Sequence, residues 1–211
     1  MNAAASPRLQ IVVLAAGMSR RLGRPKALAR VRGTSLLLRT VAQLAPLAGP
    51  RILVVAPPRS TRYQAELRGQ PVALIANPRR GRGLSSSVRL ALAHARYCAA
   101  MLLVPVDLVE LRRDEMAKLI RRWKSSPRRV VARRIEGRGR TPMIVPKWLF
   151  SAAAEITGDR GLREWVDRLP AGQAVLIEVP SAARDVDTRE DLERARRGPP
   201  RSHQTADCTS R

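Results

Sequence analysis

Two patterns of apolar residues alternate along the chain. Short runs rich in Val, Ile and Leu favour β-strands, whereas longer segments with an apolar residue at every third or fourth position favour amphipathic helices. Strands are predicted at Leu9–Ala15, Arg51–Ala56, Val72–Ala76, Ala100–Pro105, Arg129–Ala132, Met143–Val145 and Ala174–Val179. Helices are predicted at Thr34–Leu47, Ser60–Arg68, Leu84–Tyr97, Arg112–Lys124, Pro146–Ala154, Gly161–Arg168 and Thr188–Arg197.

The predicted strands are apolar at nearly every position, which indicates a sheet buried on both faces. We therefore expect an α/β protein with a mostly parallel sheet between two layers of helices, a three-layer α/β/α sandwich. In open sheets of this kind a ligand binds beyond the carboxyl ends of the strands. The candidate site is formed by Ala16–Lys26, Asn77–Ser87 and Asp107, which follow the first, third and fourth strands, and by Asp185–Asp187 before the last helix.

The length of 211 residues and the apolar content of 45% are those of one α/β domain with a sizeable core. The domain is expected over residues 1–197. Residues 198–211 contain paired prolines, polar residues and no apolar periodicity, so they are predicted to form a disordered tail.

The formal net charge of +23 predicts attraction for anions in general: nucleotides, nucleic acid, acidic partners or membrane surfaces. Arginines on solvated faces would give the same surplus. The aromatic content is 3% and no nucleic-acid-binding motif is recognised, so specific binding of nucleic acid is not expected.

The two cysteines, Cys98 and Cys208, are too few for a disulfide framework or a Cys-based zinc site, which favours a reducing compartment. The first residues, MNAAASPRLQ, lack a basic segment followed by a long apolar stretch, so no signal peptide is expected, and no apolar run approaches the length of a membrane span. We expect a soluble, cytoplasmic protein that does not bind membranes.

The stretch VVLAAGMSRRLGRPKAL, from Val12 to Leu28, runs from a predicted strand into a glycine-containing loop with several cations. Five residues separate Gly17 from Gly23, whereas a Walker loop needs four and then Gly-Lys-Ser/Thr. A dinucleotide-binding fingerprint needs three glycines that open a helix. Pro25 and the scattered cations instead favour a loop that stays extended.

This loop resembles the Leu-Ala-Ala-Gly-x-Ser-x-Arg-Met-Gly-x-x-Lys signature of the MobA-like NTP transferases, and among them the molybdenum cofactor cytidylyltransferases are the nearest. Leu22 replaces the Met of the signature. Three further segments resemble the family in the same order: NPRRGRGLSSSVRLAL, TPMIVPKWLF with the following TGDRGLREWV, and DVDTREDL. The resemblance spans about residues 9–195.

The resemblance implies a Rossmann-like, nucleotide-diphospho-sugar transferase fold and a nucleotidyltransferase. Its expected reaction is the Mg²⁺-dependent transfer of a nucleoside monophosphate from an NTP, CTP in the nearest relatives, to a phosphorylated acceptor with release of pyrophosphate. The expected acceptor is the molybdopterin cofactor. A molybdoenzyme or its maturation factor is then a candidate protein partner.

The implied site residues follow from the same resemblance. Arg21 and Lys26 neutralise charge on the phosphates, because in-line nucleotidyl transfer builds negative charge on the phosphate oxygens and on departing pyrophosphate. Asp107 completes the catalytic set and is a metal ligand with Asp187 or Asp185. The implied nucleotide-binding residues are Leu14, Ala15, Ala16, Gly17, Lys26, Asn77, Gly83, Ser86 and Ser87. Among them, the small residues of the loop let backbone approach a base and its phosphates.

Each assignment has a structural alternative. Arg21 and Lys26 can belong to a solvated loop, Asp107 can be a turn or cap residue, and Asp185 or Asp187 can cap the last helix. The serines of the Gly-Leu-Ser-Ser-Ser segment can likewise cap a helix. The sequence Arg-Thr-Pro stands at residues 140–142 where the family has Gly-His-Pro, which leaves the acceptor open. A sugar phosphate or another small phosphate is the alternative acceptor, and a basic nucleic-acid-binding protein is the alternative outside enzymes.

Overall fold

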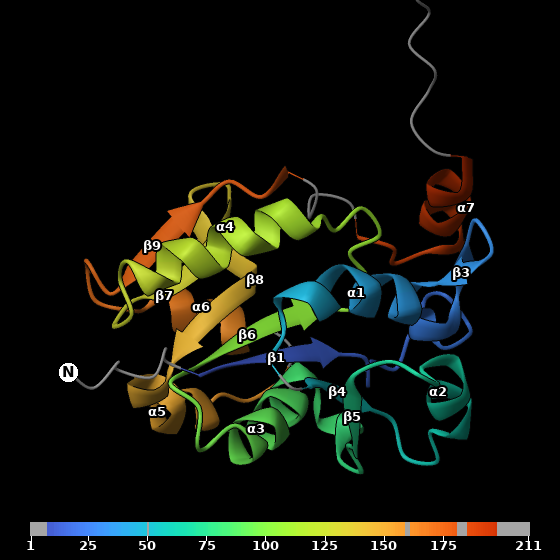
Figure 1. Ribbon diagram of the computed structural model, residues 1–211, viewed down its shortest axis with the longest axis horizontal. Helices are drawn as coiled ribbons and strands as arrows, with labels where there is room; N and C mark the ends of the chain where they lie inside the picture. The colour runs from blue at the N-terminus through green and yellow to red at the C-terminus, as the bar shows by residue number, and fades with distance from the viewer. Residues whose placement is uncertain (1–7, 50, 159–160, 181–184, 198–211) are drawn as a thin grey trace, which may run out of the picture.

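The computed structural model describes residues 8–49, 51–158, 161–180 and 185–197, and within them the chain folds around one central sheet (Figure 1). The predicted tail, residues 198–211, lies outside the described residues. No helix in the described ranges has both the length and the apolar character needed to cross a membrane.

Seven strands of the described chain form the central sheet in the order β5-β4-β1-β6-β8-β7-β9. They are β1 (Leu9–Leu14), β4 (Ile52–Ala56), β5 (Val72–Ala76), β6 (Ala100–Pro105), β7 (Val130–Ile135), β8 (Arg138–Pro146) and β9 (Ala174–Ile177). β8 runs antiparallel to both of its neighbours, and every other pair in the sheet is parallel. The expected mostly parallel sheet is therefore confirmed.

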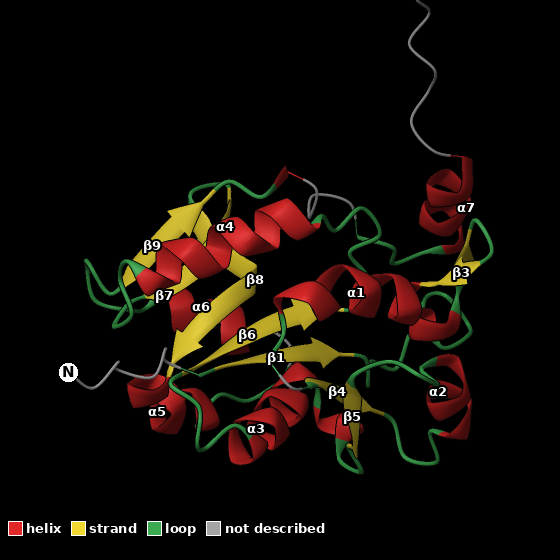
Figure 2. Ribbon diagram, in the orientation of Figure 1, coloured by secondary structure: helices red, strands yellow, loops and turns green. Residues whose placement is uncertain are grey.

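Helices cover both faces of this sheet, which confirms the three-layer α/β/α sandwich (Figures 1 and 2). α1 (Leu36–Leu44) and α4 (Arg113–Lys124) pack on one face, and α3 (Leu84–His94), α5 (Phe150–Ala154) and α6 (Gly161–Asp167) pack on the other. α2 (Thr61–Glu66) and α7 (Arg189–Arg197) lie at the end of the molecule toward which β1 points. Short 3₁₀ turns occur at Lys26–Leu28, Ala45–Leu47, Arg80–Arg82 and Lys147–Leu149.

The alternation of side chains along β1 explains why the sheet is sandwiched. Ile11 and Val13 contribute to the core under α1 and α4, while Val12 and Leu14 contribute to the core under α3. All four are 6% exposed or less. Burial of an aliphatic side chain stabilises the fold by about 1.5–3 kcal/mol, so a strand that is apolar on both faces requires helices on both sides.

The structure differs from the predicted elements where polar residues interrupt the apolar pattern. The helix predicted at Thr34–Leu47 begins at Leu36, because Ser35 caps it by accepting a hydrogen bond from the Leu38 amide at 3.1 Å. Residues 30–35 instead form a small antiparallel hairpin of β2 (Arg30–Val31) and β3 (Thr34–Ser35). β7 and β8 extend beyond the predicted strands into a charged hairpin. The sequence did not predict this extension, because the hairpin residues lack the apolar pattern of a buried strand.

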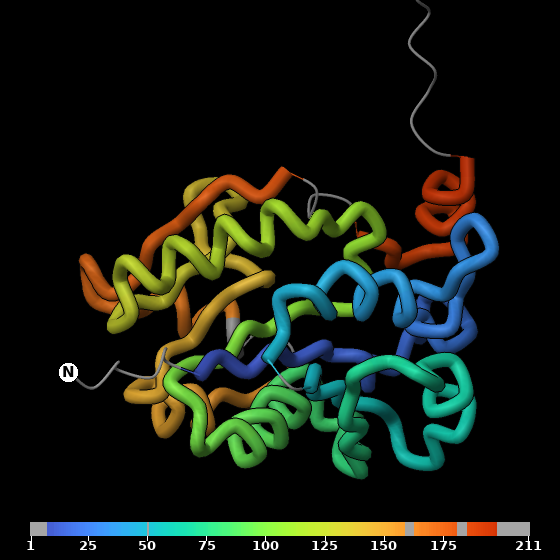
Figure 3. Tube along the Cα trace, viewed as in Figure 1, coloured from blue at the N-terminus to red at the C-terminus, as the bar shows by residue number. Residues whose placement is uncertain are grey.

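The topology brings three distant segments to one edge of the sheet. Because β8 is antiparallel to β6 and β7, the carboxyl ends of β1, β6 and β7 point the same way. The chain after β9 then returns toward the β2–β3 hairpin, where α7 lies beside β2 (Figure 3). Arg196 Nε donates a hydrogen bond to the Arg30 carbonyl there at 3.1 Å.

Gly139 of β8 tests how closely the layers approach. A Cβ atom at this position would lie 2.6 Å from Val166 Cγ1 of α6 and 3.1 Å from Leu176 Cδ2 of β9. We expect Gly139→Ala to lower the free energy of unfolding by about 1–3 kcal/mol through overpacking, measured by urea denaturation. Gly49→Ala is the control, because a Cβ at Gly49 meets nothing within 4 Å. Equal stabilities of the two variants would contradict close α6–β8 packing.

Candidate active site

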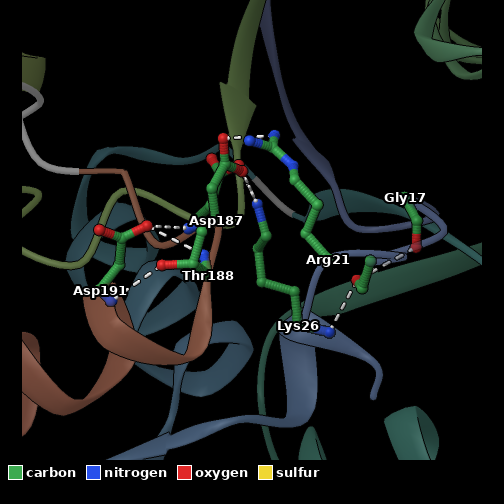
Figure 4. A network of polar contacts seen from close by, with 8 residues as sticks. Gly17, Arg21, Lys26, Asp187, Thr188 and Asp191 are labelled. Carbon is green, nitrogen blue, oxygen red and sulfur yellow. Dashed lines mark hydrogen bonds and ion pairs between the residues drawn. The ribbon is translucent and has the colours of Figure 1, made fainter. Parts of the chain in front are cut away.

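The ammonium group of Lys26 joins two aspartates that are far apart in the sequence. Lys26 Nζ lies 2.9 Å from Asp107 Oδ2 and 2.6 Å from Asp187 Oδ1. Arg21 Nη2 lies 2.6 Å from the other oxygen of Asp187 (Figure 4). The glycine loop, the end of β6 and the start of α7 therefore meet at one ion-pair network, as the positions after strand ends predict.

A turn centred on Ser19 delivers both cations of the loop. The amides of Leu22 and Gly23 donate to the Ser19 carbonyl at 3.1 and 3.2 Å, and the Lys26 amide donates to Ser19 Oγ at 2.9 Å. Ser19 has a φ of +51°, which allows the chain to reverse direction. The expectation of an extended loop is therefore wrong for residues 20–23, which form a turn, whereas Pro25 keeps extended backbone with a φ of −56° and a ψ of 110°.

Leu22 fixes the loop to the rest of the molecule. Its side chain is 1% exposed and packs in an apolar cluster with Leu36 of α1, Val186 and Leu192 of α7. Leu22 thus joins the glycine loop, which carries Lys26, to the segment before α7, which carries Asp187. This packing explains why an aliphatic residue suits the position where the family signature has Met.

Asp187 is available to Lys26 because other residues cap α7. Thr188 Oγ1 accepts from the Asp191 amide at 3.1 Å, and Asp191 Oδ2 accepts from the amides of Thr188 and Asp187 at 2.9 and 3.1 Å (Figure 4). This reciprocal arrangement is a capping box. The cap therefore comes from Thr188 and Asp191, and the side chain of Asp187 points instead to the two cations.

Asp185 is the third carboxylate of the site. It forms an antiparallel bridge with Leu108, directly after Asp107, and the Val186 amide donates to the Asp107 carbonyl at 3.1 Å. Asp185 keeps exposed surface because it faces an open cavity, but the protein around that cavity partly buries its carboxyl group. This burial and the negative charge of Asp107 raise the pKa of Asp185 to about 6.

The ion pairs shift the pKa values of Lys26 and Asp187 in opposite directions. Burial alone would lower the pKa of Lys26, but the charges and hydrogen bonds of Asp107 and Asp187 raise it above its ordinary value. Burial alone would raise the pKa of Asp187, but Lys26 and Arg21 lower it. Both groups are therefore charged at neutral pH, and cations and carboxylates face each other in ionised form.

The first turn of α3 is held by Asn77, which follows β5. Asn77 Nδ2 donates to Ser86 Oγ at 2.8 Å and to Ser87 Oγ at 2.9 Å, and its Oδ1 accepts from the Arg79 amide. Gly83, with a φ of +86°, is the N-cap residue, so the serines are not the N-cap of α3. Asn77 is 2% exposed, and its hydrogen bonds tie the loop after β5 to the first turn of α3.

These segments enclose a cavity of about 770 Å³ at the carboxyl edge of the sheet. Most of the predicted site residues line it: Leu14, Ala15, Ala16, Gly17, Arg21, Lys26, Gly83, Ser87, Asp107, Asp185 and Asp187. Asn77 and Ser86 do not line it; they lie behind Ser87 and hold it in place. A Cβ at Gly17 would meet nothing within 4 Å, so the backbone of the glycine loop is open to a ligand.

Arg133 is a cavity residue that the sequence prediction did not single out. It lies in β7, borders the cavity and is 5% exposed. The rule that site residues follow strand ends could have found it, because the predicted strand ended at Ala132. The neighbouring arginine, Arg134, made Arg133 look like part of a charged surface, so its position after the strand end was not noticed.

The carboxylates have the chemistry of a site for a hard divalent cation. Asp107 and Asp187 approach the single cationic centre of Lys26 closely enough to share it. Mg²⁺ in nucleotide sites is held by one or two carboxylates together with phosphate oxygens, and the residues present fit such a set. Among the described residues, no group of three or more His, Cys, Asp or Glu side chains is arranged as a metal site.

Comparisons with known proteins agree with this geometry. The family model of the MobA-like NTP transferase domain matches residues 11–174. A probable molybdenum cofactor guanylyltransferase of Rhodopirellula baltica is 34% identical over 133 residues, which span 62% of this chain and 63% of that protein. The match thus covers less than two thirds of the relative's length.

Two solved structures are similar over nearly the whole chain. Rv0371c of Mycobacterium tuberculosis H37Rv superimposes with a TM-score of 0.72 and 25% identity, covering 92% of this chain and 99% of that one. A structure of Rv0371c in complex with manganese gives a TM-score of 0.68 and 23% identity, covering 92% and 100%. The second likeness supports the fold.

The capping box of α7 yields a stability prediction. Asp191→Ala removes the acceptor for two backbone amides, so we expect the free energy of unfolding to fall by about 1 kcal/mol. Glu193→Ala is the control, because Glu193 is exposed and its ion pair with Arg197, at 4.0 Å, is long. Chemical denaturation of both variants measures the difference. If Asp191→Ala proved as stable as the control, the cap would not be what positions Asp187.

Proposed function

The chain belongs to the MobA-like NTP transferase family, and from this premise we propose that it transfers a nucleoside monophosphate from an NTP to the phosphate of a small acceptor. The observation that carries the proposal is the position of Lys26, between Asp107 and Asp187 and directly after the glycine loop. A cavity with cations and carboxylates beside open backbone is suited to a triphosphate and a divalent cation.

In the proposed reaction an oxygen of the acceptor phosphate forms a bond to the α-phosphorus of the NTP. The bond from the α-phosphorus to the pyrophosphate oxygen breaks, and pyrophosphate leaves with the electron pair. The attacking oxygen is already anionic, so no residue has to remove a proton. Arg21 and Lys26 neutralise the phosphates and the departing pyrophosphate, and the cavity orients the two reactants.

Asp107, with Asp187 or Asp185, would hold the divalent cation. When bound, the cation neutralises phosphate charge. Magnesium is the proposed ion, and the manganese complex of the neighbouring Rv0371c structure supports a divalent metal at this fold. Burial and, after it, the negative charge of Asp107 raise the pKa of Asp185, and a bound cation would offset the contribution of that charge.

Cytosine is the proposed base and molybdopterin the proposed acceptor. The Leu-Ala-Ala-Gly loop supports CTP, since it resembles the cytidylyltransferases of the family. The name of the relative from Rhodopirellula baltica supports the molybdenum cofactor as acceptor, and it favours GTP as the second candidate donor. A molybdoenzyme or its maturation factor would then receive the product.

Calorimetry tests the choice of nucleotide. We expect CTP with Mg²⁺ to bind at least about tenfold more tightly than ATP or GTP, because hydrogen bonds to the base edge discriminate by 1–3 kcal/mol. Tighter binding of GTP would change the assignment to guanylyl transfer. The absence of binding by every NTP would refute the proposed function.

Asp107→Asn tests the metal assignment. We expect pyrophosphate release to fall about 100-fold or more, because the amide keeps the shape but loses the charge that holds the cation. Stability should change by no more than about 1 kcal/mol, since the side chain is partly exposed and Lys26 keeps its pair with Asp187. Asp114→Asn, at an exposed carboxylate of α4, is the control. Near-normal turnover of Asp107→Asn would remove Asp107 from the mechanism.

A further inference from the structure

Arg133 carries a buried charge whose hydrogen bonds are incomplete. The residue is 5% exposed, and its Nε and Nη1 atoms have no hydrogen-bond partner within the described part of the chain. A buried cation without acceptors costs several kcal/mol unless a ligand or ordered water supplies them. Arg133 also borders the cavity, so a group bound there can compensate its delocalised charge.

The surroundings of Arg133 show which kind of group is missing. Asp185 and Asp107 attract its charge, whereas Arg163 and Arg140 repel it. Arg140 already has a carboxylate of its own, because its Nη1 lies 3.0 Å from Asp167 Oδ1. Arg133 has no such pair among the residues that the structure describes. The missing group is therefore an anion.

The sheet is interrupted beside this residue. Ala132 pairs with Met143 of β8, but Arg133 pairs with Arg140, so two residues of β8 have no partner in β7 at that point. This bulge ends the regular ladder where β7 reaches the cavity. Such irregularities near a site re-aim side chains, and here the bulge lies next to Arg133.

Arg133 lies far from the segments that would hold the nucleotide. The glycine loop follows β1, and Ser87 belongs to α3, which follows β5. In the sheet, β6 and β8 lie between β1 and β7. Three strand spacings correspond to about 14 Å. Asp107 follows β6, which lies between β1 and β7 in the sheet, so we distinguish a half of the cavity beside the glycine loop from a half beside Arg133.

We propose that Arg133 binds the phosphate monoester of the acceptor in the half of the cavity opposite the glycine loop, and so helps to select the acceptor. This inference rests on the proposed function, which needs an acceptor phosphate on the far side of the aspartates from pyrophosphate. A phosphate monoester has its second pKa near 6. A guanidinium has no proton to give up at neutral pH, so it holds the dianion, which is the nucleophile of the transfer.

Arg133→Met tests the site with phenyl phosphate as a probe for a phosphate monoester. Calorimetry at constant ionic strength measures the Kd of phenyl phosphate and of CTP for each variant. We expect Arg133→Met to weaken phenyl phosphate binding at least about tenfold, the loss of one charge-assisted hydrogen bond. The Kd of CTP should stay within about twofold, because the nucleotide lies in the other half of the cavity.

Arg134→Met is the matched control, since it removes the same charge from the next residue of β7. The side chain of Arg134 is 51% exposed, pairs with Glu178 at 3.4 Å and does not line the cavity. Its affinities should equal those of the wild type. Equal loss of phenyl phosphate binding in both variants would overturn the proposal in favour of a nonspecific basic surface.

Other outcomes are equally decisive. No binding of phenyl phosphate by the wild type would overturn the site, and a parallel loss of CTP and phenyl phosphate in Arg133→Met would assign Arg133 to the nucleotide. Arg133→Lys covers the case in which the Met variant does not fold: it keeps the charge but loses the planar donors, and it should weaken phenyl phosphate alone. Failure of the proposed function would give a different result: the wild type would neither bind CTP nor release pyrophosphate, whatever the phenyl phosphate result.

Discussion

The site depends on one ion pair that is shared, the ammonium of Lys26 between Asp107 and Asp187. Three carboxylates from two distant segments converge here, and like charges at this range repel each other. The pKa of Asp185 is raised first by burial and then by this repulsion from Asp107. Lys26, together with Arg21, supplies the positive charge that lets the end of β6 and the start of α7 approach the glycine loop. Under the proposed function the same balance suits the site to phosphates, because a triphosphate and its cation would bring matching charges of their own.

Backbone structure makes this balance specific. The turn at Ser19 orients Lys26, the burial of Leu22 fixes the loop against α7, and the cap formed by Thr188 and Asp191 leaves the carboxylate of Asp187 for the cations. None of these contacts needs a ligand. The cations and carboxylates are therefore held in position before a substrate arrives, which is the condition for electrostatic preorganisation in catalysis.

Much of this arrangement could be predicted from the sequence. Apolar strands predicted a buried sheet, and strand ends predicted that Lys26, Asp107 and Asp187 meet. The β2–β3 hairpin could not be predicted, because four residues carry too little pattern against the neighbouring helix signal. The role of Asn77 beneath Ser87 depends on where two side chains meet in space. Arg133 stayed hidden among neighbouring arginines, since only its burial distinguishes it from exposed Arg134.

The position of Asp185, Asp187 and α7 near the end of the sequence affects how the site can change in evolution. The family match ends at residue 174, the first residue of β9, yet two of the three clustered carboxylates lie after it. The strands of the sheet and the carboxylates of Asp185 and Asp187 are thus encoded in separate stretches of the gene, because β9 ends at Ile177. Recombination between β9 and Asp185 would exchange Asp185, Asp187 and their supporting helix together, and the balance of charges in the site could change without any change in the sheet.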